Sequence, residues 1–477
     1  ESIQTNLTIT HNHPTKNHCV IYTGSNPLPA GTTILSSYPL ATQLLGNTET
    51  RSLRCSYCFQ KQSKLLRCAQ CQNVRYCNRT CQKKDWTENG HKLICKQLKR
   101  KECAIDVILA IQTLSKLSKE EYQHCQIQPL SKQSTTHPKP IICGLSHWNS
   151  VYSGPSNSAE DTAHINLVQE IIQTIPTCKQ EEARSTLRKF QYNNFSIFDE
   201  LHNSYAAGVY PWAATVNHSC CPNVLVRFAT AQGEVPILEF VSCKEIQPGD
   251  EICHSYVDLT LEEMERKAEL KDKYGIHPCD CIRCSSSSAE NAMAFWPCGE
   301  KETIQTLDPF FWDISRMNEK RQIVPISQVY YTPSDIPLDD IHHCLEQATF
   351  SFQKDDDAAE LSFLQQALHL HDSKSSLPLS PFSYRICCKL LSSLLVSGKI
   401  QEALDICIRI VCCLCVALGK DMVYHPLLGL QLFTLADLYE GCGRNEEATS
   451  AYIWCRKILR VTHGKESEMV QRLNMIL

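Results

Sequence analysis

Residues 54–95 read RCSYCFQKQSKLLRCAQCQNVRYCNRTCQKKDWTENGHKLIC. In this stretch two Cys-x2-Cys pairs precede two pairs whose members stand four positions apart, a spacing that puts both members on one face of a helical turn. Eight ligands complete two tetrahedral zinc sites with none left over, and because neither site keeps a position open for water, we expect structural zinc. The candidate ligands are Cys55, Cys58, Cys68, Cys71, Cys77, Cys81, His91 and Cys95.

These eight ligands can be paired sequentially or in an interleaved order. Interleaving would lock the two halves of a 41-residue segment to each other, so we expect it. Regular spacing of this kind favours metal binding over disulfides. One ion would then be held by Cys55, Cys58, Cys77 and Cys81, and the other by Cys68, Cys71, His91 and Cys95.

The whole chain has 477 residues, enough for about three domains, and 29 of them are cysteine. A cysteine content this high indicates either a disulfide framework or thiolate metal sites in a reducing compartment. The first thirty residues show no signal-peptide pattern, and the longest apolar run, residues 406–418, is short and contains Arg409. We therefore expect metal sites in a protein that is neither secreted nor embedded in a membrane.

Charge is unevenly distributed along the chain. Residues 51–101 contain 14 Lys and Arg against two acids, whereas the rest carries 33 basic and 49 acidic residues. A basic segment on an acidic body suggests an anionic partner, although a solvated face of a small domain would look the same.

A second group of motifs lies downstream. Asn-His-Ser-Cys-Cys-Pro-Asn occupies residues 217–223, and Gly-Asp-Glu-Ile-Cys-His-Ser-Tyr-Val-Asp occupies residues 249–258. Three cysteines then follow within six residues, at 279, 281 and 284, which is one ligand short of a tetrahedral site. Cys220 or Cys221 is the natural fourth donor.

The C-terminal third is predicted to be helical from about Asp339. Gly398-Lys-Ile-Gln-Glu-Ala recurs 45 positions later as Gly443-Arg-Asn-Glu-Glu-Ala, and each copy follows a leucine-rich stretch. This pattern indicates repeated helical hairpins that bind a partner or simply pack together. Helices are also expected at 165–175 and 181–190, an irregular insert at 128–158 and a flexible joint at 285–288. The cysteines of this third lack ligand spacing and are expected in the core: Cys387, Cys388, Cys407, Cys412, Cys413 and Cys415.

The ligand spacing of the finger, with Tyr76-Cys77 and Cys81-Gln82-Lys83-x2-Trp86, resembles a MYND finger. Together with the downstream motifs, with PLPAGTTIL at 27–35, NNFSI at 193–197 and RVTHG at 460–464, the chain resembles the SET and MYND domain (SMYD) family of protein-lysine methyltransferases. The resemblance implies an α+β fold with a split SET domain, an inserted MYND finger, a post-SET zinc site and a C-terminal tetratricopeptide-like helical domain. The expected parts are an N-terminal SET segment at 1–50, the finger at 51–95, a helical insert at 96–190, the core SET domain at 191–258, the post-SET region at 259–285 and helical repeats at 286–477.

The same resemblance implies S-adenosylmethionine-dependent methylation of lysine in histone or non-histone proteins. It makes Tyr256 the catalytic tyrosine and Phe195 and Tyr274 walls of the lysine channel. The residues implied to contact the cofactor are Asn193, Asn217, His218 and Tyr256. It also implies a third zinc ion, held by Cys220, Cys279, Cys281 and Cys284.

The expected partners are a protein substrate and, at the finger, a proline-rich peptide or nucleic acid. A monomer in the cytoplasm and nucleus is expected.

One departure keeps a second hypothesis open. Members of this family carry a Gly-x-Gly turn before the first SET strand, where the missing side chains let the backbone approach the cofactor. Residues 15–21, Thr-Lys-Asn-His-Cys-Val-Ile, contain no glycine, and the first one after them is Gly24. The alternative is a catalytically weak or inactive SET and MYND adaptor that acts in transcriptional regulation through protein–protein interaction.

Overall fold

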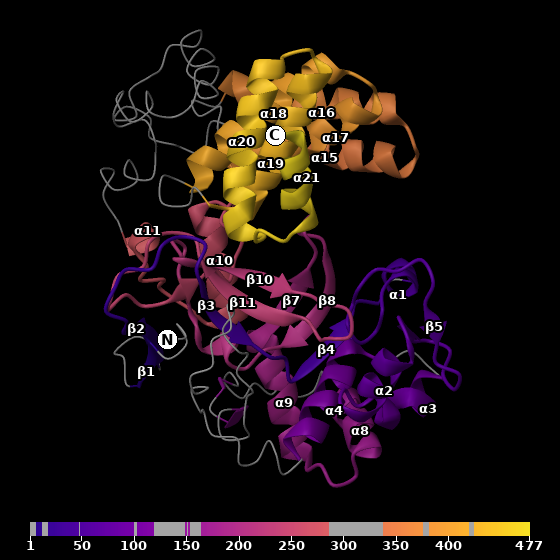
Figure 1. Ribbon diagram of the computed structural model, residues 1–477. Helices are drawn as coiled ribbons and strands as arrows, with labels where there is room; N and C mark the ends of the chain where they lie inside the picture. The colour runs from indigo at the N-terminus through magenta and orange to yellow at the C-terminus, as the bar shows by residue number, and fades with distance from the viewer. Residues whose placement is uncertain are drawn as a thin grey trace. The chain divides into compact units, whose positions relative to one another are not determined.

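The computed structural model mixes helices and small sheets (Figure 1). It describes residues 6–11, 18–46, 48–99, 103–118, 148–149, 151–152, 164–285, 337–374, 381–418 and 424–477. These residues form two compact units. The first comprises Glu1–His218 and Asn223–His254, and the second comprises Ser219–Pro222 and Ser255–Leu477.

The first unit contains the sheets, all with short strands. β1 (Leu7–His11) pairs antiparallel with β2 (His18–Tyr22). β11 (Ile237–Ser242) is central between β10 (Val224–Ala229) and β3 (Thr33–Ser37), and β8 (Ser204–Val209) is central between β4 (Ala41–Leu44) and β7 (Asn194–Phe198). Most residues of the two central strands are buried, in keeping with the apolar side chains of β8 and β11. β9 (Asn217–His218) and β12 (Cys253–His254) form a separate parallel pair.

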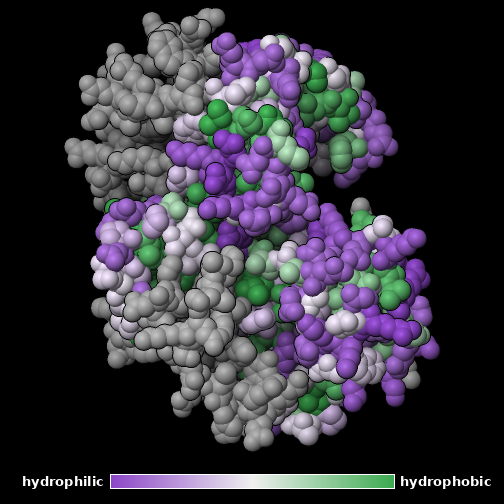
Figure 2. Space-filling view, in the orientation of Figure 1, coloured by the Kyte–Doolittle hydropathy of each residue, from purple (hydrophilic) through white to green (hydrophobic). Residues whose placement is uncertain are grey.

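The finger segment folds around β5 (Leu66–Arg67), β6 (Arg75–Tyr76), α2 (Arg79–Thr87) and α3 (His91–Leu98). Its buried cysteines belong to the same core as α4 (Ile105–Leu117), a helix that is buried on most sides. Hydrophilic residues cover most of the visible face of this part of the chain (Figure 2).

The other helices of the first unit are α1 (Thr48–Leu53), α8 (Ile165–Thr174) and α9 (Gln180–Asn193), and the last two correspond to the helices expected at 165–175 and 181–190. The irregular insert at 128–158 lies almost wholly outside the described residues.

The second unit is helical. α10 (Glu263–Tyr274) starts at a capping box formed by Glu262 and Glu265 and ends at Gly275, whose φ of 67° is left-handed. Its remaining helices are α11 (Ile282–Ser285), α15 (Leu338–Gln353), α16 (Asp357–Lys374), α17 (Pro381–Val396), α18 (Ile400–Leu418), α19 (Pro426–Gly441), α20 (Asn445–Thr462) and α21 (Glu468–Ile476).

Helical hairpins follow the 45-residue repeat. α17 packs on α18 and α19 packs on α20, and the repeated glycines Gly398 and Gly443 stand in the two turns with φ of 70° and 74°. Those left-handed values explain why glycine recurs at both positions. Of the six cysteines expected in the core of this helical region, Cys387, Cys407, Cys412 and Cys413 are buried, whereas Cys388 and Cys415 are half-buried. None of the helices that the structure describes combines the length and apolar character needed to cross a lipid bilayer.

Candidate functional site

The first cluster of the finger consists of Cys55, Cys58, Cys77 and Cys81. Its Sγ atoms lie within 4.8 Å of one another, with Cys58 3.6 Å from Cys77 and 3.9 Å from Cys81. A tetrahedral ion with Zn–S bonds of about 2.3 Å separates its sulfurs by about 3.8 Å. The donor set and spacing therefore fit zinc.

The sequence prediction that Cys77 shares a helical turn with Cys81 was wrong. Cys77 follows β6, and α2 begins only at Arg79 because Asn78 caps the helix. The Asn78 side chain accepts a hydrogen bond from the backbone N–H of Cys81 at 2.9 Å, while its own backbone is extended. The sulfur of Cys77 reaches the cluster from this extended segment.

The second cluster consists of Cys68, Cys71, His91 and Cys95. Nε2 of His91 lies 3.5 Å from the sulfur of Cys68 and 3.7 Å from that of Cys71, and the sulfurs of Cys68 and Cys95 are 3.8 Å apart. Burial lowers the pKa of His91 to about 4, so the imidazole is neutral at pH 7, the form that binds a metal. His91 and Cys95 both lie on α3, one turn apart.

The third cluster brings Cys220 together with Cys279, Cys281 and Cys284, all in the second unit. The sulfurs of Cys220 and Cys284 are 3.6 Å apart. Cys221, the other candidate donor, is not among the four. The structure thus brings together the three ligand sets that were expected, with the interleaved order in the finger.

Arg283 stands between two ligands of the third cluster and was not singled out from the sequence. Its guanidinium donates to the backbone carbonyls of Cys220 at 3.4 Å, Leu259 at 3.3 Å and Ala417 at 2.7 Å. Ala417 lies in the last turn of α18, where a cation is favoured by the helix dipole. Arg283 therefore links the cluster to the end of a helix.

Two of the expected site tyrosines lie together in the second unit. The rings of Tyr256 and Tyr274 are 5.0 Å apart at 52°, and the hydroxyl of Tyr274 donates to the backbone carbonyl of Tyr256 at 3.3 Å. Tyr274 is the last residue of α10. Burial raises the pKa of Tyr274 above its ordinary value, so its phenol stays neutral at physiological pH.

The other expected site residues lie in the first unit. Asn217 and His218 form β9, whose partner β12 contains His254. The Asn217 amide donates to the carbonyl of His18 at 2.6 Å and to the Glu251 carboxylate at 2.8 Å. His218 is buried.

Asn223 anchors the segment that contains β12. Its amide nitrogen donates to the carbonyl of Glu251 at 2.8 Å, and its amide oxygen accepts from the backbone N–H of Cys253 at 2.9 Å. The last residues of the Asn-His-Ser-Cys-Cys-Pro-Asn motif thus position the Glu-Ile-Cys-His segment that precedes Tyr256 in the chain.

Phe195 makes two aromatic contacts in this unit. Its ring stacks on that of His254 with centroids 5.8 Å apart at 28°, and it meets Tyr210 edge-on at 6.0 Å. The sequence analysis assigned no role to His254. The feature of the sequence that could have indicated one is its position two residues before Tyr256. Asn193, at the end of α9, donates its amide hydrogens to the carbonyls of Tyr152 at 2.8 Å and Lys189 at 2.7 Å.

Comparison with known proteins agrees with this arrangement. Residues 55–95 match the family model of the MYND finger. The histone-lysine N-methyltransferase ASHR1 of Arabidopsis thaliana is 28% identical over 463 residues, which cover 93% of this chain and 89% of that protein. The histone-lysine N-methyltransferase SMYD3 of Mus musculus is 23% identical over 470 residues, or 94% of this chain and 92% of that protein.

A third relative matches over a shorter span. The N-lysine methyltransferase SMYD2 of Homo sapiens is 28% identical over 277 residues, so the match spans 56% of that protein and 54% of this chain. The chain thus contains a MYND finger and shares homology along most of its length with lysine methyltransferases of the SMYD family.

Proposed function

We propose that this protein is an S-adenosylmethionine-dependent protein-lysine N-methyltransferase with a split SET domain. The observation that carries the proposal is the parallel pair of β9 and β12, because it joins the Asn217-His218 motif to the segment that leads to Tyr256, a segment that Asn223 also anchors. Homology to named lysine methyltransferases along most of the chain supports it.

The chemistry sets a clear demand on the residues around the acceptor amine. A lysine amine with a pKa near 10.4 must lose its proton before it can attack, at a cost of roughly 4–5 kcal/mol at neutral pH. Desolvation in an apolar channel and a neighbouring positive charge both lower the pKa of an amine. When bound, S-adenosylmethionine supplies that positive charge and the methyl group.

The protein's own residues would exclude water from the amine and orient it. Phe195 and Tyr274 are assigned to the channel walls, and Tyr256 presents a hydroxyl that orients the amine. Tyr274, neutral because burial raises its pKa, adds a hydrogen-bonding group rather than a charge. Asn193 and Asn217 already donate their amide hydrogens to protein oxygens, so their amide oxygens are the atoms assigned to the cofactor, beside His218.

The proposed function implies a division of the chain into domains. We assign the SET domain to 1–50 and 191–258, the helical insert to 96–190, the post-SET region to 259–285 and a tetratricopeptide-like domain to 286–477. The finger at 51–95 would bind a proline-rich peptide or nucleic acid. Histone or non-histone proteins would be the substrates of a monomer in the cytoplasm and nucleus.

A catalytically silent adaptor is the second candidate, and one contact favours it. Gly24 is the first glycine after β2, and a Cβ on it would lie 2.0 Å from the Tyr22 hydroxyl. That hydroxyl donates to the carbonyl of Asn26 at 2.8 Å. The space that Gly24 leaves is therefore filled by the protein's own tyrosine.

Cofactor binding and methyl transfer test the first proposal. Calorimetry with S-adenosylmethionine should show binding, and labelled cofactor should transfer its methyl group to proteins of a whole-cell extract. Tyr256→Phe should abolish transfer, because the orienting hydroxyl is lost. Tyr452→Phe, which removes a hydroxyl bonded to Asp437 in the helical region, should leave transfer unchanged.

Two results would instead support the adaptor. They are a wild-type protein that binds no cofactor at physiological concentration, and partner capture that is lost in Cys68→Ser while methyl transfer stays undetectable.

A further inference from the structure

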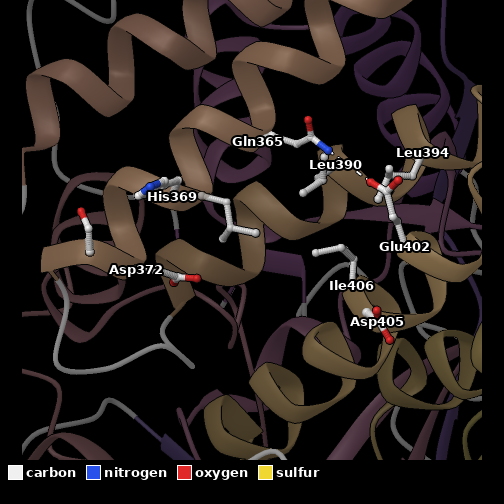
Figure 3. Close-up of a pocket in the computed structure, with 10 residues that line it drawn as sticks. Gln365, His369, Asp372, Leu390, Leu394, Glu402, Asp405 and Ile406 are labelled. Carbon is white, nitrogen blue, oxygen red and sulfur yellow. Dashed lines mark hydrogen bonds between the residues drawn. The ribbon is translucent and has the colours of Figure 1, made fainter. Parts of the chain in front are cut away.

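Residues of α16, α17 and α18 line an open cavity of about 770 Å³ (Figure 3). One side of the cavity is a single face of α16, because its lining residues there follow one another at helical spacing. They are Gln365, Leu368, His369, Asp372 and Ser373. The volume lies within the range of about 300–1,000 Å³ that is typical of ligand pockets.

The cavity combines an apolar floor with carboxylates. Leu390 and Leu394 of α17 are 2% and 1% exposed, and Ile406 of α18 projects between the helices in Figure 3. Glu402 and Asp405 of α18 line the same cavity one helical turn apart. A long side chain with an aliphatic stem and a cationic head would match both parts.

The carboxylates differ in how far they are already neutralised. Asp372 receives two hydrogen bonds from Arg409, at 2.6 and 2.7 Å, and this internal pair leaves it no net charge to offer.

The other two carboxylates are more available. Glu402 contacts Lys399 at 3.2 Å, but both side chains are about half exposed, so this pair is weak. Gln365 also donates to Glu402 at 3.2 Å. Asp405 forms no ion pair within 4 Å of any residue that the structure describes, but its carboxylate accepts a hydrogen bond from the Gln401 side chain and is attracted by the more distant charge of Arg444.

Other ligands fit less well. A bound anion would face the carboxylates. A divalent cation is disfavoured, because among the described residues only the three cysteine-rich clusters have ligand atoms close enough to hold one. A small cation alone would leave most of the volume unfilled, whereas the polar row of Gln365, His369 and Ser373 can hydrogen-bond an extended peptide backbone.

We propose that this cavity binds a basic peptide segment of a partner protein. A Lys or Arg side chain would lay its stem on the half-buried Leu368 and Ile406, above the buried Leu390 and Leu394, and bring its head to Glu402 and Asp405. The cavity uses none of the residues assigned to methyl transfer. It therefore gives the protein a second place to hold a basic chain, whether or not the first proposal holds.

Fluorescence anisotropy on the full chain tests this inference. The probe is a labelled dodecapeptide of alternating Lys and Ala, and a Gln and Ala peptide is the uncharged control. Glu402→Gln with Asp405→Asn should weaken binding of the Lys peptide at least about tenfold, since these isosteric changes remove both available charges. Glu346→Gln with Asp355→Asn removes two exposed carboxylates outside the cavity and should leave affinity unchanged.

Several outcomes would overturn the inference. The first is equal affinity for the Lys peptide and the uncharged control peptide. The second is an affinity for the Lys peptide that falls equally in both double variants or does not fall in the cavity variant. The third is displacement of the Lys peptide by spermine at a concentration equal to the Kd of the peptide. Circular dichroism checks that each variant is folded. Glu402→Gln with Asp405→Asn should still bind S-adenosylmethionine and transfer its methyl group like wild type, so a failure of methyl transfer and a failure of this site are told apart.

Discussion

Two double substitutions distinguish the interleaved finger from a sequential one. Cys58→Ser with Cys81→Ser removes two ligands from the first cluster and leaves the second whole. Cys58→Ser with Cys68→Ser removes one ligand from each cluster. In a sequential finger these two outcomes would be exchanged.

The expected losses are large. Structural zinc contributes about 10–16 kcal/mol in finger peptides at pH 7, or about 2.5–4 kcal/mol for each of four ligands. Because 1.4 kcal/mol is a factor of ten, one lost thiolate weakens an ion by about 10²- to 10³-fold. Two lost thiolates in one cluster weaken it by about 10⁴-fold or more, which abolishes binding in practice.

The number of zinc ions that each variant retains against chelators of increasing affinity distinguishes the two arrangements. Wild type should hold three tight ions. Cys58→Ser with Cys81→Ser should hold two, and Cys58→Ser with Cys68→Ser should hold one tight ion and two that a moderate chelator removes. Cys103→Ser with Cys178→Ser, buried cysteines outside the clusters, should keep all three. The reverse order in the first two variants would refute the interleaved arrangement.

Three further predictions concern stability. Burial raises the pKa of Asp85 to about 6 from an ordinary 3.8, so its ionisation opposes folding, and the free energy of unfolding should fall as pH rises from about 4 to about 6. Asp85→Asn should remove this part of the pH dependence of urea unfolding at fixed zinc. Arg409→Met leaves the half-buried Asp372 without its guanidinium partner and should lower the unfolding free energy in urea by about 1–3 kcal/mol. Gly429→Ala places a Cβ 2.6 Å from buried Leu459 and should cost about 1–3 kcal/mol in the same assay, whereas Gly441→Ala, with open space around it, should cost nothing.

The ligand pairs of the finger could be predicted because their information is local, whereas the choice of Cys220 for the third set rested on the family resemblance. A Cys-x2-Cys pair and a His and Cys one helical turn apart define their own geometry, and Gly398 and Gly443 mark turns wherever they occur. The local rule failed at Cys77, because the capping preference of Asn78 made the helix begin at Arg79, two residues later than the spacing suggested.

Contacts between distant segments could not be predicted in this way. Asn217 donates to His18, which is 199 positions away, and nothing at either residue signals the pairing. Likewise, the Tyr22 ring fills the space left by Gly24, and its position is determined by packing rather than by sequence spacing. The sequence therefore predicted the local metal-binding pairs but not these contacts between distant segments.

Arg283 connects the third cluster to the carbonyl end of α18. The residue is held in place because Cys281 and Cys284 flank it, and its bond to Ala417 neutralises the carbonyl end of α18. Loss of the ion, or oxidation of either flanking thiol, would release the backbone on both sides of Arg283 and leave that helix end without its cation. Zinc loss or thiol oxidation would therefore affect the end of a helix that also lines the carboxylate cavity.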